Sequence, residues 1–206
     1  MEKLSSQDIK KNTEVYDYVT YLGNPDFWFG THKDDNYERL TRITEFTKIA
    51  LKGTKCLDVG SGTGDLSNFL SRKDVAEYLG VDIYEQSLDL ARRKHPNELF
   101  LKMDILHWNT DEKFDYAFCS GALSTNFESD NYDFIESMIR KMWSLAKIGV
   151  SFNFITVDLP WLDHTIFHYS TERVIEMCKK VIESNGYMSY QIIDGEAHVY
   201  LWKGQK

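Results

Sequence analysis

The sequence predicts an α/β fold, a doubly wound and mostly parallel sheet with helices on both faces. From Lys55 onward, short apolar runs rich in β-branched and aromatic residues alternate with segments of helical periodicity. This alternation is typical of a parallel sheet covered by helices. Near the end of the chain, Asp194-Gly195 separates two further strand-like runs and predicts a β-hairpin. The sheet is therefore expected to end in an antiparallel pair.

Five strands are expected to run parallel before the hairpin. Each is a short run rich in β-branched or aromatic residues, bounded by polar or helical segments. The five runs are Lys55 to Val59, Glu77 to Ile83, Leu99 to Met103, Phe114 to Cys119 and Val150 to Thr156, and the hairpin strands are Tyr187 to Ile193 and Glu196 to Trp202.

Three helices are predicted from apolar residues at helical spacing. The first follows a cap at Asp34 or Asp35, the second begins after Asp130, and the third begins after Ser170. The third is expected to end at Asn185-Gly186, where glycine takes the left-handed cap conformation. The apolar stripes are Leu40, Ile43, Phe46 and Ala50; Ile135, Met138, Ile139, Met142 and Ala146; and Val174, Cys178, Val181 and Ile182.

Length and composition favour a single domain. Of the 206 residues, 42% are hydrophobic and 14% are aromatic, which is ample for a folded core. We expect one domain over 1–206, with an N-terminal cover at 1–36 and a core at 37–206. Cys56, Cys119 and Cys178 lie among apolar neighbours and are interpreted as small buried hydrophobic residues.

Charge and hydropathy disfavour several classes of protein. The chain has 24 Lys and Arg against 32 Asp and Glu, a formal net charge of −8, which disfavours a general nucleic-acid binder. No apolar run approaches the roughly 18–20 residues of a membrane span. The segment from Met1 to Asn12 is charged and polar, unlike a signal peptide. We therefore expect a cytoplasmic protein that does not bind membranes.

A glycine-rich loop follows the first expected strand. Its sequence is Asp58-Val59-Gly60-Ser61-Gly62-Thr63-Gly64, and a helical segment comes next. Glycines let the backbone turn sharply and lie against a ligand, because no Cβ blocks the approach. Such glycines also occur in purely structural turns, so the loop alone is weak evidence for a nucleotide-like ligand.

Acidic residues at the ends of the next two strands strengthen that interpretation. Asp82 ends the second strand, 18 residues beyond Gly64, where a carboxylate can accept hydrogen bonds from ribose hydroxyls. Asp104 ends the third strand, where a carboxylate can accept from an exocyclic adenine amine. The loop and the two acids together predict a nucleoside site.

Two ligands fit this arrangement, a dinucleotide and S-adenosylmethionine. A dinucleotide loop normally reads Gly-x-Gly-x-x-Gly and leaves the helix N-terminus free for an anionic pyrophosphate. Here the glycines are Gly60, Gly62 and Gly64, with Asp58 before them and Asp65 at the helix start. These carboxylates would repel a pyrophosphate and suit a sulfonium ligand that bears an ammonium group. S-adenosylmethionine is therefore the favoured cofactor.

On these motifs the sequence resembles the class I S-adenosylmethionine-dependent methyltransferases, specifically small, stand-alone and largely uncharacterised ones. The resemblance covers about Leu57 to Trp202. It implies a Rossmann-like sheet of seven strands with an antiparallel last strand, and a cofactor lying over the carboxyl ends of strands one, two and four. It further implies a methionine site at the glycine loop and Ser120-Gly121, a ribose site at Asp82, and adenine contacts from Ile83, Asp104 and Ile105.

Two aromatic segments are candidates for the methyl-acceptor pocket. Tyr18 in the N-terminal cover is a weak catalytic candidate. Tyr16, Trp28, Arg39 or Arg42 is expected to reach the methionine carboxylate or the acceptor. After strand five, the weak catalytic candidates are His164, His168 and Tyr169. Packing or surface roles explain most of these residues equally well. No metal is expected, because the two histidines have no third ligand at a suitable spacing.

The predicted function is transfer of a methyl group from S-adenosylmethionine to an O or N atom of an unidentified, small-molecule acceptor. Two alternatives from other classes stay open, a catalytically silent S-adenosylmethionine-binding protein and an NAD(P)-dependent oxidoreductase. The sequence does not identify the acceptor, a general base or the oligomeric state.

Overall fold

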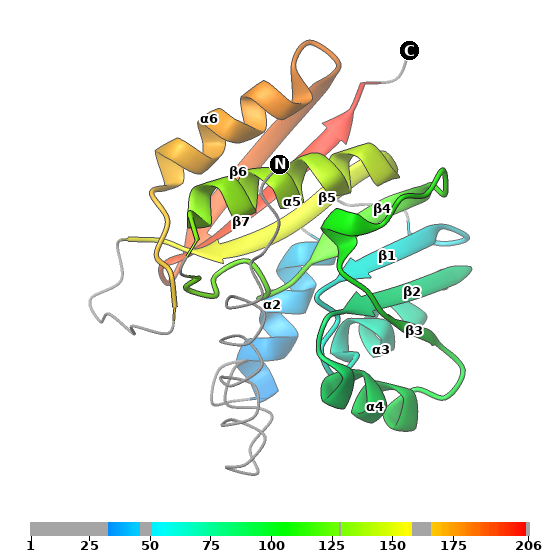
Figure 1. Ribbon diagram of the computed structural model, residues 1–206. Helices are drawn as coiled ribbons and strands as arrows, with labels where there is room; N and C mark the ends of the chain where they lie inside the picture. Colours follow the sequence, from blue (N-terminus) through cyan, green and yellow to red (C-terminus); the bar gives the residue numbers. More distant parts are fainter. Residues whose placement is uncertain (1–32, 46–50, 128, 158–165, 205–206) are drawn as a thin grey trace.

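The computed structural model describes residues 33–45, 51–127, 129–157 and 166–204, with side chains described from Tyr37 onward and not for residue 45. Seven strands form one sheet, and helices cover both of its faces (Figure 1). The strands are β1 (Lys55–Val59), β2 (Glu77–Asp82), β3 (Leu99–Lys102), β4 (Phe114–Cys119), β5 (Ala146–Ile155), β6 (Gly186–Ile193) and β7 (Glu196–Lys203). The helices are α2 (Lys33–Glu45), α3 (Asp65–Ser71), α4 (Glu85–Lys94), the 3-10 helix η2 (Ile105–His107), α5 (Asn131–Leu145) and α6 (Thr171–Ile182).

The strand order is β3-β2-β1-β4-β5-β7-β6. Strand β1 pairs in parallel with both β2 and β4, so the winding direction reverses between β1 and β4. Strand β7 runs antiparallel to β5 and to β6. The doubly wound sheet and its antiparallel ending are confirmed. In such sheets, ligands bind beyond the carboxyl ends of the strands at the reversal point.

Successive side chains along the strands point to opposite faces of the sheet and pack into two separate hydrophobic cores. Cys56 of β1 packs with the residues of α2, α3 and α4, whereas its neighbour Leu57 packs with those of α5 and α6. Figure 1 shows the same division, with α5 and α6 on one side of the sheet and α2, α3 and α4 on the other. Both faces of the central strands β1, β2 and β4 are buried, as expected for a parallel sheet covered by helices.

Two predicted helix starts are confirmed by side-chain caps. The Asp130 side chain accepts hydrogen bonds from the backbone N–H groups of Tyr132 and Asp133 at the start of α5. Ser170 accepts from the N–H of Arg173 at the start of α6. These bonds satisfy N–H groups that have no partner within the helix.

The predicted end of the last helix is wrong. Helix α6 ends at Ile182, Glu183 takes the left-handed conformation with φ 48°, and Gly186 opens β6. Gly186 is needed for a different reason, because a Cβ there would lie 2.7 Å from the carbonyl oxygen of Trp202 on the paired strand.

The hairpin prediction is confirmed at its turn. Asp194 and Gly195 have φ values of 52° and 78°, the two left-handed residues of a type I′ turn. One detail of the earlier segments differs from expectation, and another is not tested. Ala146 belongs to β5 and not to the preceding helix, so β5 begins four positions before Val150. Phe46 and Ala50 lie outside the described residues.

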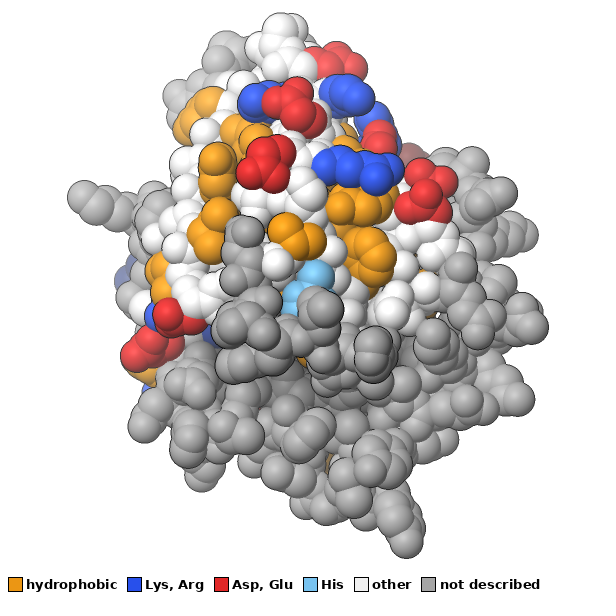
Figure 2. Space-filling view, turned by 90° about the vertical axis from the view of Figure 1, so that its left-hand side faces the viewer, with side chains coloured by type: hydrophobic (Ala, Val, Ile, Leu, Met, Phe, Trp, Pro, Cys, Tyr) orange, Lys and Arg blue, Asp and Glu red, His pale blue; other side chains and the backbone are white. Residues whose placement is uncertain are grey.

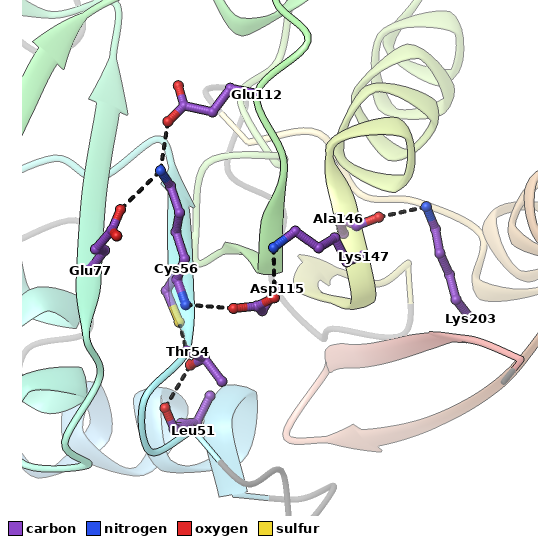
Figure 3. A network of polar contacts seen from close by, with 10 residues as sticks. Leu51, Thr54, Cys56, Glu77, Glu112, Asp115, Ala146, Lys147 and Lys203 are labelled. Carbon is purple, nitrogen blue, oxygen red and sulfur yellow. Dashed lines mark hydrogen bonds and ion pairs between the residues drawn. The ribbon is translucent and has the colours of Figure 1, made fainter.

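A polar network joins the amino ends of four strands, β1, β2, β4 and β5 (Figure 3). The Lys55 ammonium lies 2.9 Å from Glu77 and 2.7 Å from Glu112. The Lys55 N–H donates to Asp115 Oδ2 at 2.8 Å, and Lys147 Nζ donates to Asp115 Oδ1 at 3.1 Å. Burial alone would raise the pKa of Asp115, but the Lys55 N–H and the Lys147 charge lower it. Asp115 therefore links β1, β4 and β5 at the amino edge of the sheet.

The described surface on the side shown in Figure 2 has mixed charge. Basic and acidic side chains are interspersed there, and apolar side chains lie between them and the grey, undescribed segments. Within the described part of the chain, no helix combines the length and apolar character required to cross a membrane.

Candidate functional site

The glycine loop joins β1 to α3 through three left-handed glycines. Gly60, Gly62 and Gly64 have φ values of 72°, 51° and 84°. The N–H groups of Gly60 and Ser61 donate to the Val81 carbonyl oxygen at 2.8 Å and 3.1 Å, which fixes the loop against β2. A Cβ on Gly60 would lie only 2.3 Å from the Cβ of Ala122. The loop therefore requires glycine for both its dihedral angles and its close contact with the segment after β4.

Asp82 holds the loop from the end of β2. Its Oδ2 accepts the Gly62 N–H at 2.8 Å, and its Oδ1 accepts the Tyr84 N–H at 2.9 Å. The residue is only 7% exposed, and burial raises its pKa although these N–H bonds oppose the rise. Each carboxylate oxygen can accept a second hydrogen bond. Asp82 therefore has acceptor capacity left for a ligand in the cleft that it lines.

Asp58 is a buried carboxyl beside the loop. The Tyr78 hydroxyl donates to its Oδ2 at 2.6 Å. Burial raises the pKa of Asp58 to about 7, the negative charges of Asp82 and Asp65 add to the rise, and the Tyr78 bond opposes it. The group is thus close to half protonated at neutral pH. A cation bound nearby would favour its ionised form.

Asp104 and Ile105 lie at the end of β3, as expected. The Asp104 carboxylate caps η2 by accepting the Leu106 N–H at 3.0 Å, and it also contacts His107 Nδ1. Asp104, Ile105, Ile83 and Asp82 line one compartment of a cleft at the carboxyl edge of the sheet.

This first compartment has about 560 Å³ of space, part of which is open to solvent. Its walls are mainly apolar, and its acids lie at the ends of β2 and β3. Sequence reasoning missed the part of the wall that comes from α5 and from the segment before it, namely Thr125, Phe127, Phe134 and Met138.

A second compartment, with about 740 Å³ of open space, adjoins the first and shares Gly60, Ala122 and Thr125 with it. It is lined by Arg39 from α2, by Ser120 and Gly121 after β4, and by residues of β5 and β7. The hydroxyl oxygens of Ser61 and Ser120 are buried and have no hydrogen-bond partner among the described residues. Ser61, Ser120, Asp58 and Arg39 line a small hollow beside this compartment.

Asn153 and Glu196 were also missed by sequence reasoning. Asn153 Oδ1 accepts the Gly121 N–H at 2.8 Å, and its amide nitrogen donates to Glu196 Oε1. Both residues line the second compartment, and Asn153 is only 1% exposed. The signal for Asn153 in the sequence was a polar side chain inside a strand run that is mostly apolar, whereas Glu196 stands at the start of its strand and gave no such signal.

The acceptor-side candidates divide into three groups. Arg39 lines the cleft, whereas the Arg42 guanidinium is paired with Glu38 at 2.7 Å. The expectation that Tyr169 lies in the acceptor pocket is wrong. Tyr169 is fully buried in the core, and its hydroxyl donates to the Leu123 carbonyl oxygen at 2.9 Å. It does not line either compartment of the cleft.

The structure does not test the roles of the remaining candidates. His168 contacts the Thr156 carbonyl oxygen through Nδ1 at 3.1 Å. Tyr16, Tyr18, Trp28 and His164 lie outside the described residues. In the part of the chain that the structure describes, no group of three or more His, Cys, Asp or Glu side chains is arranged to hold a metal ion.

Comparison with known families supports the interpretation from the site. Residues 56–149 match a family described as a methyltransferase domain. This segment of the chain is therefore similar to a methyltransferase domain. The match begins in β1, includes the glycine loop, Asp82 and Asp104, and ends in β5.

Curated relatives share only part of their length with this chain. A demethylmenaquinone methyltransferase of Chlorobaculum tepidum is 33% identical over 97 residues, which are 46% of this chain and 40% of that protein. A trans-aconitate 2-methyltransferase of Escherichia coli is 27% identical over 111 residues, which are 52% of this chain and 40% of that protein. The matched segment thus spans less than half of each relative.

Solved structures match this chain over almost its whole length. Magnesium protoporphyrin IX methyltransferase (ChlM) of Synechocystis PCC 6803 with bound SAM has a TM-score of 0.72 at 14% identity, covering 98% of this chain and 100% of that one. The DhpI–SAH complex has a TM-score of 0.71 at 18% identity, with the same coverage. At these identities the likeness establishes the fold.

Proposed function

We propose that the protein transfers the methyl group of S-adenosylmethionine to an O or N atom of a small-molecule acceptor. The observation that carries this proposal is the continuous cleft at the carboxyl edge, which combines a left-handed glycine loop with acids at the ends of three adjacent strands. These acids are Asp58, Asp82 and Asp104. The relatives named above act on small molecules, as their names state.

The residues of the cleft fit the cofactor part by part. Asp82 has acceptor capacity for the ribose hydroxyls, and Ile83, Ile105 and Asp104 form an apolar slot with a polar edge for the adenine. The unpartnered hydroxyls of Ser61 and Ser120 supply hydrogen bonds for the methionine part. A cationic sulfonium and ammonium compensate the buried acids, whereas a pyrophosphate would meet repulsion from Asp58.

When bound, the cofactor supplies a methyl group on a positively charged sulfur. The chain orients this group, since displacement at the methyl carbon needs the acceptor in line and within contact distance. Phe134 and Met138 of α5 form an apolar wall of the adenosine compartment. Positioning accounts for much of the acceleration in such a reaction, so the proposal requires no general base unless the acceptor must lose a proton.

Calorimetric titration of the purified protein tests cofactor choice. We expect S-adenosylmethionine and S-adenosylhomocysteine to bind and NADPH not to bind. Asp82→Ala should weaken S-adenosylhomocysteine binding by about 1–3 kcal/mol, because the ribose hydroxyls lose a buried partner. Asp89→Asn, an exposed acid on α4, is the matched control and should bind as the wild type does. Binding of NADPH alone would show the oxidoreductase alternative to be right.

Turnover separates an enzyme from a silent binding protein. Incubation with methyl-labelled S-adenosylmethionine and a metabolite extract should give a labelled small molecule in a wild-type sample. Tight cofactor binding without any labelled product under varied conditions would favour the silent binder. The cytoplasmic location expected from the sequence stays a prediction.

A further inference from the structure

Resting on the proposed function, we propose that Glu196 receives the methyl acceptor and that the acceptor is an amine, whose nitrogen gains positive charge as it is methylated. The observations are the position of Glu196 in the second compartment, its hydrogen-bond link to the methionine side of the cleft, and the charges around it.

Glu196 is joined to the predicted methionine site by a single side chain. Asn153 accepts the Gly121 N–H and donates to Glu196, so it bridges the segment after β4 and the first residue of β7. The Glu196 side chain is 17% exposed and lines the compartment. A group bound beside this carboxylate therefore lies next to the methyl-donor end of the cleft.

The surroundings of Glu196 keep it ionised. Burial alone would raise the pKa of Glu196, but the His198 and Asn153 contacts and the positive charge of Arg39 lower it. His198 Nε2 lies 3.6 Å from Glu196 Oε2, and this imidazole is fully buried with no hydrogen-bond partner among the described residues. Arg39 from α2 lines the same compartment and the hollow beside Asp58. Glu196 is thus a fixed anion and a weak base.

The Glu196 carboxylate, as a fixed anion and a weak base, favours an amine over a hydroxyl or a carboxylate as the methyl acceptor. The lone pair of a neutral amine forms the bond to the methyl carbon while the carbon–sulfur bond breaks. The sulfur leaves as a neutral thioether, the positive charge passes to nitrogen, and a proton is then lost to water. Glu196 stabilises that developing charge without taking a proton in the step. A hydroxyl acceptor would need a stronger base, and a carboxylate acceptor would be repelled.

The walls of the compartment suit an amine with an apolar body. Phe154, Ile155 and Ile166 contribute its apolar surface, and Glu196 with Asn153 contributes the polar end. Benzylamine and benzoate are therefore suitable probes, since they have similar size and opposite charge at neutral pH. The benzylammonium ion stands in for the positively charged methylated product.

The experiment measures binding of both probes to the full chain saturated with S-adenosylhomocysteine, by ligand-observed NMR titration. We expect benzylamine to bind at least about tenfold more tightly than benzoate. Glu196→Gln should remove that preference, and Glu196→Asp, which keeps the charge, should retain it. Glu176→Gln on the exposed face of α6 is the matched control and should behave as the wild type does.

Several outcomes would overturn the proposal. Equal or tighter binding of benzoate would make Arg39 the group that selects the acceptor. Equal behaviour of Glu196→Gln and Glu196→Asp would show that the charge is not what binds the probe. Failure of S-adenosylhomocysteine to bind at the start would instead refute the proposed function, and the amine assignment with it.

Discussion

Gly60 gives the sharpest test of how the loop is built, because two separate costs oppose any side chain there. Its φ of 72° lies in the left-handed region, which costs a residue other than glycine about 1–2 kcal/mol. The Cβ would also lie 2.3 Å from the Ala122 Cβ, and relieving such overpacking costs about 1–3 kcal/mol. Gly60→Ala should therefore lower the free energy of unfolding by about 2–5 kcal/mol.

Two further variants separate these costs. Gly53→Ala is the control for the dihedral cost, because Gly53 has a φ of 74° and no atom within 4 Å of the added Cβ. It should lose only about 1–2 kcal/mol. In the double variant Gly60→Ala with Ala122→Gly, the close contact disappears. The loss in free energy of unfolding should then equal the sum of the losses measured for Gly53→Ala and for Ala122→Gly alone.

Urea denaturation followed by circular dichroism measures all four variants, and titration with S-adenosylhomocysteine reports on the cleft. Gly60→Ala should also weaken binding, since the loop moves away from Ala122 to relieve the contact. If Gly60→Ala is no less stable than Gly53→Ala, or if removing the Ala122 methyl restores nothing, the close contact does not determine the loop.

Two other predictions follow from shifted pKa values. Because the pKa of Asp58 is raised to about 7, stability contributed by its neutral form is lost as pH rises toward 7, and a cationic ligand should release a proton on binding. Calorimetry near neutral pH in buffers of different ionisation enthalpy should detect this release for S-adenosylmethionine in the wild type and not in Asp58→Asn; equal release in both would exclude Asp58 as its source. Asp115 is expected to have the opposite pH dependence, because its pKa is lowered in the folded protein. Its ionised form stabilises the fold above the pKa that Asp115 has in the unfolded chain, and this stability is lost as pH falls through its pKa in the folded protein. Asp115→Asn should cost about 1–2 kcal/mol at neutral pH and nothing in strong acid, as measured by urea denaturation, and a constant difference at all pH values would contradict the linkage.

Much of the fold followed from local patterns in the sequence. The bounds of β1 and β4, the caps at Asp130 and Ser170, and the Asp194-Gly195 turn depend on neighbouring residues, so they are visible without the tertiary structure. The glycine loop and its acids were found for the same reason. The end of α6 was predicted wrongly because Gly186 is required by its close contact with Trp202 on the paired strand, and not by a helix cap.

The acceptor side of the site was less predictable, because long-range pairing creates it. Asn153 meets Glu196 only when β7 folds back beside β5 and the hairpin register is set. Met138 was predicted as part of the apolar stripe of a helix, and no local pattern shows that this residue and Phe134 line a ligand compartment. Tyr169 looked like a reactive group in a loop, yet the core supplies its hydrogen-bond acceptor.

Asp115 and Asp58 lie toward opposite edges of the sheet, and their surroundings shift their pKa values in opposite directions. At the amino edge, Asp115 is matched by the Lys55 N–H and the Lys147 ammonium, and its pKa falls. At the carboxyl edge, Asp58 has a phenol as its partner and further acids nearby, and its pKa rises. An acid that the protein buries without compensating its charge costs stability, so a ligand that supplies the missing positive charge gains that free energy on binding. The cation that completes this site is therefore expected to come from the ligand, as the sulfonium and ammonium of S-adenosylmethionine do.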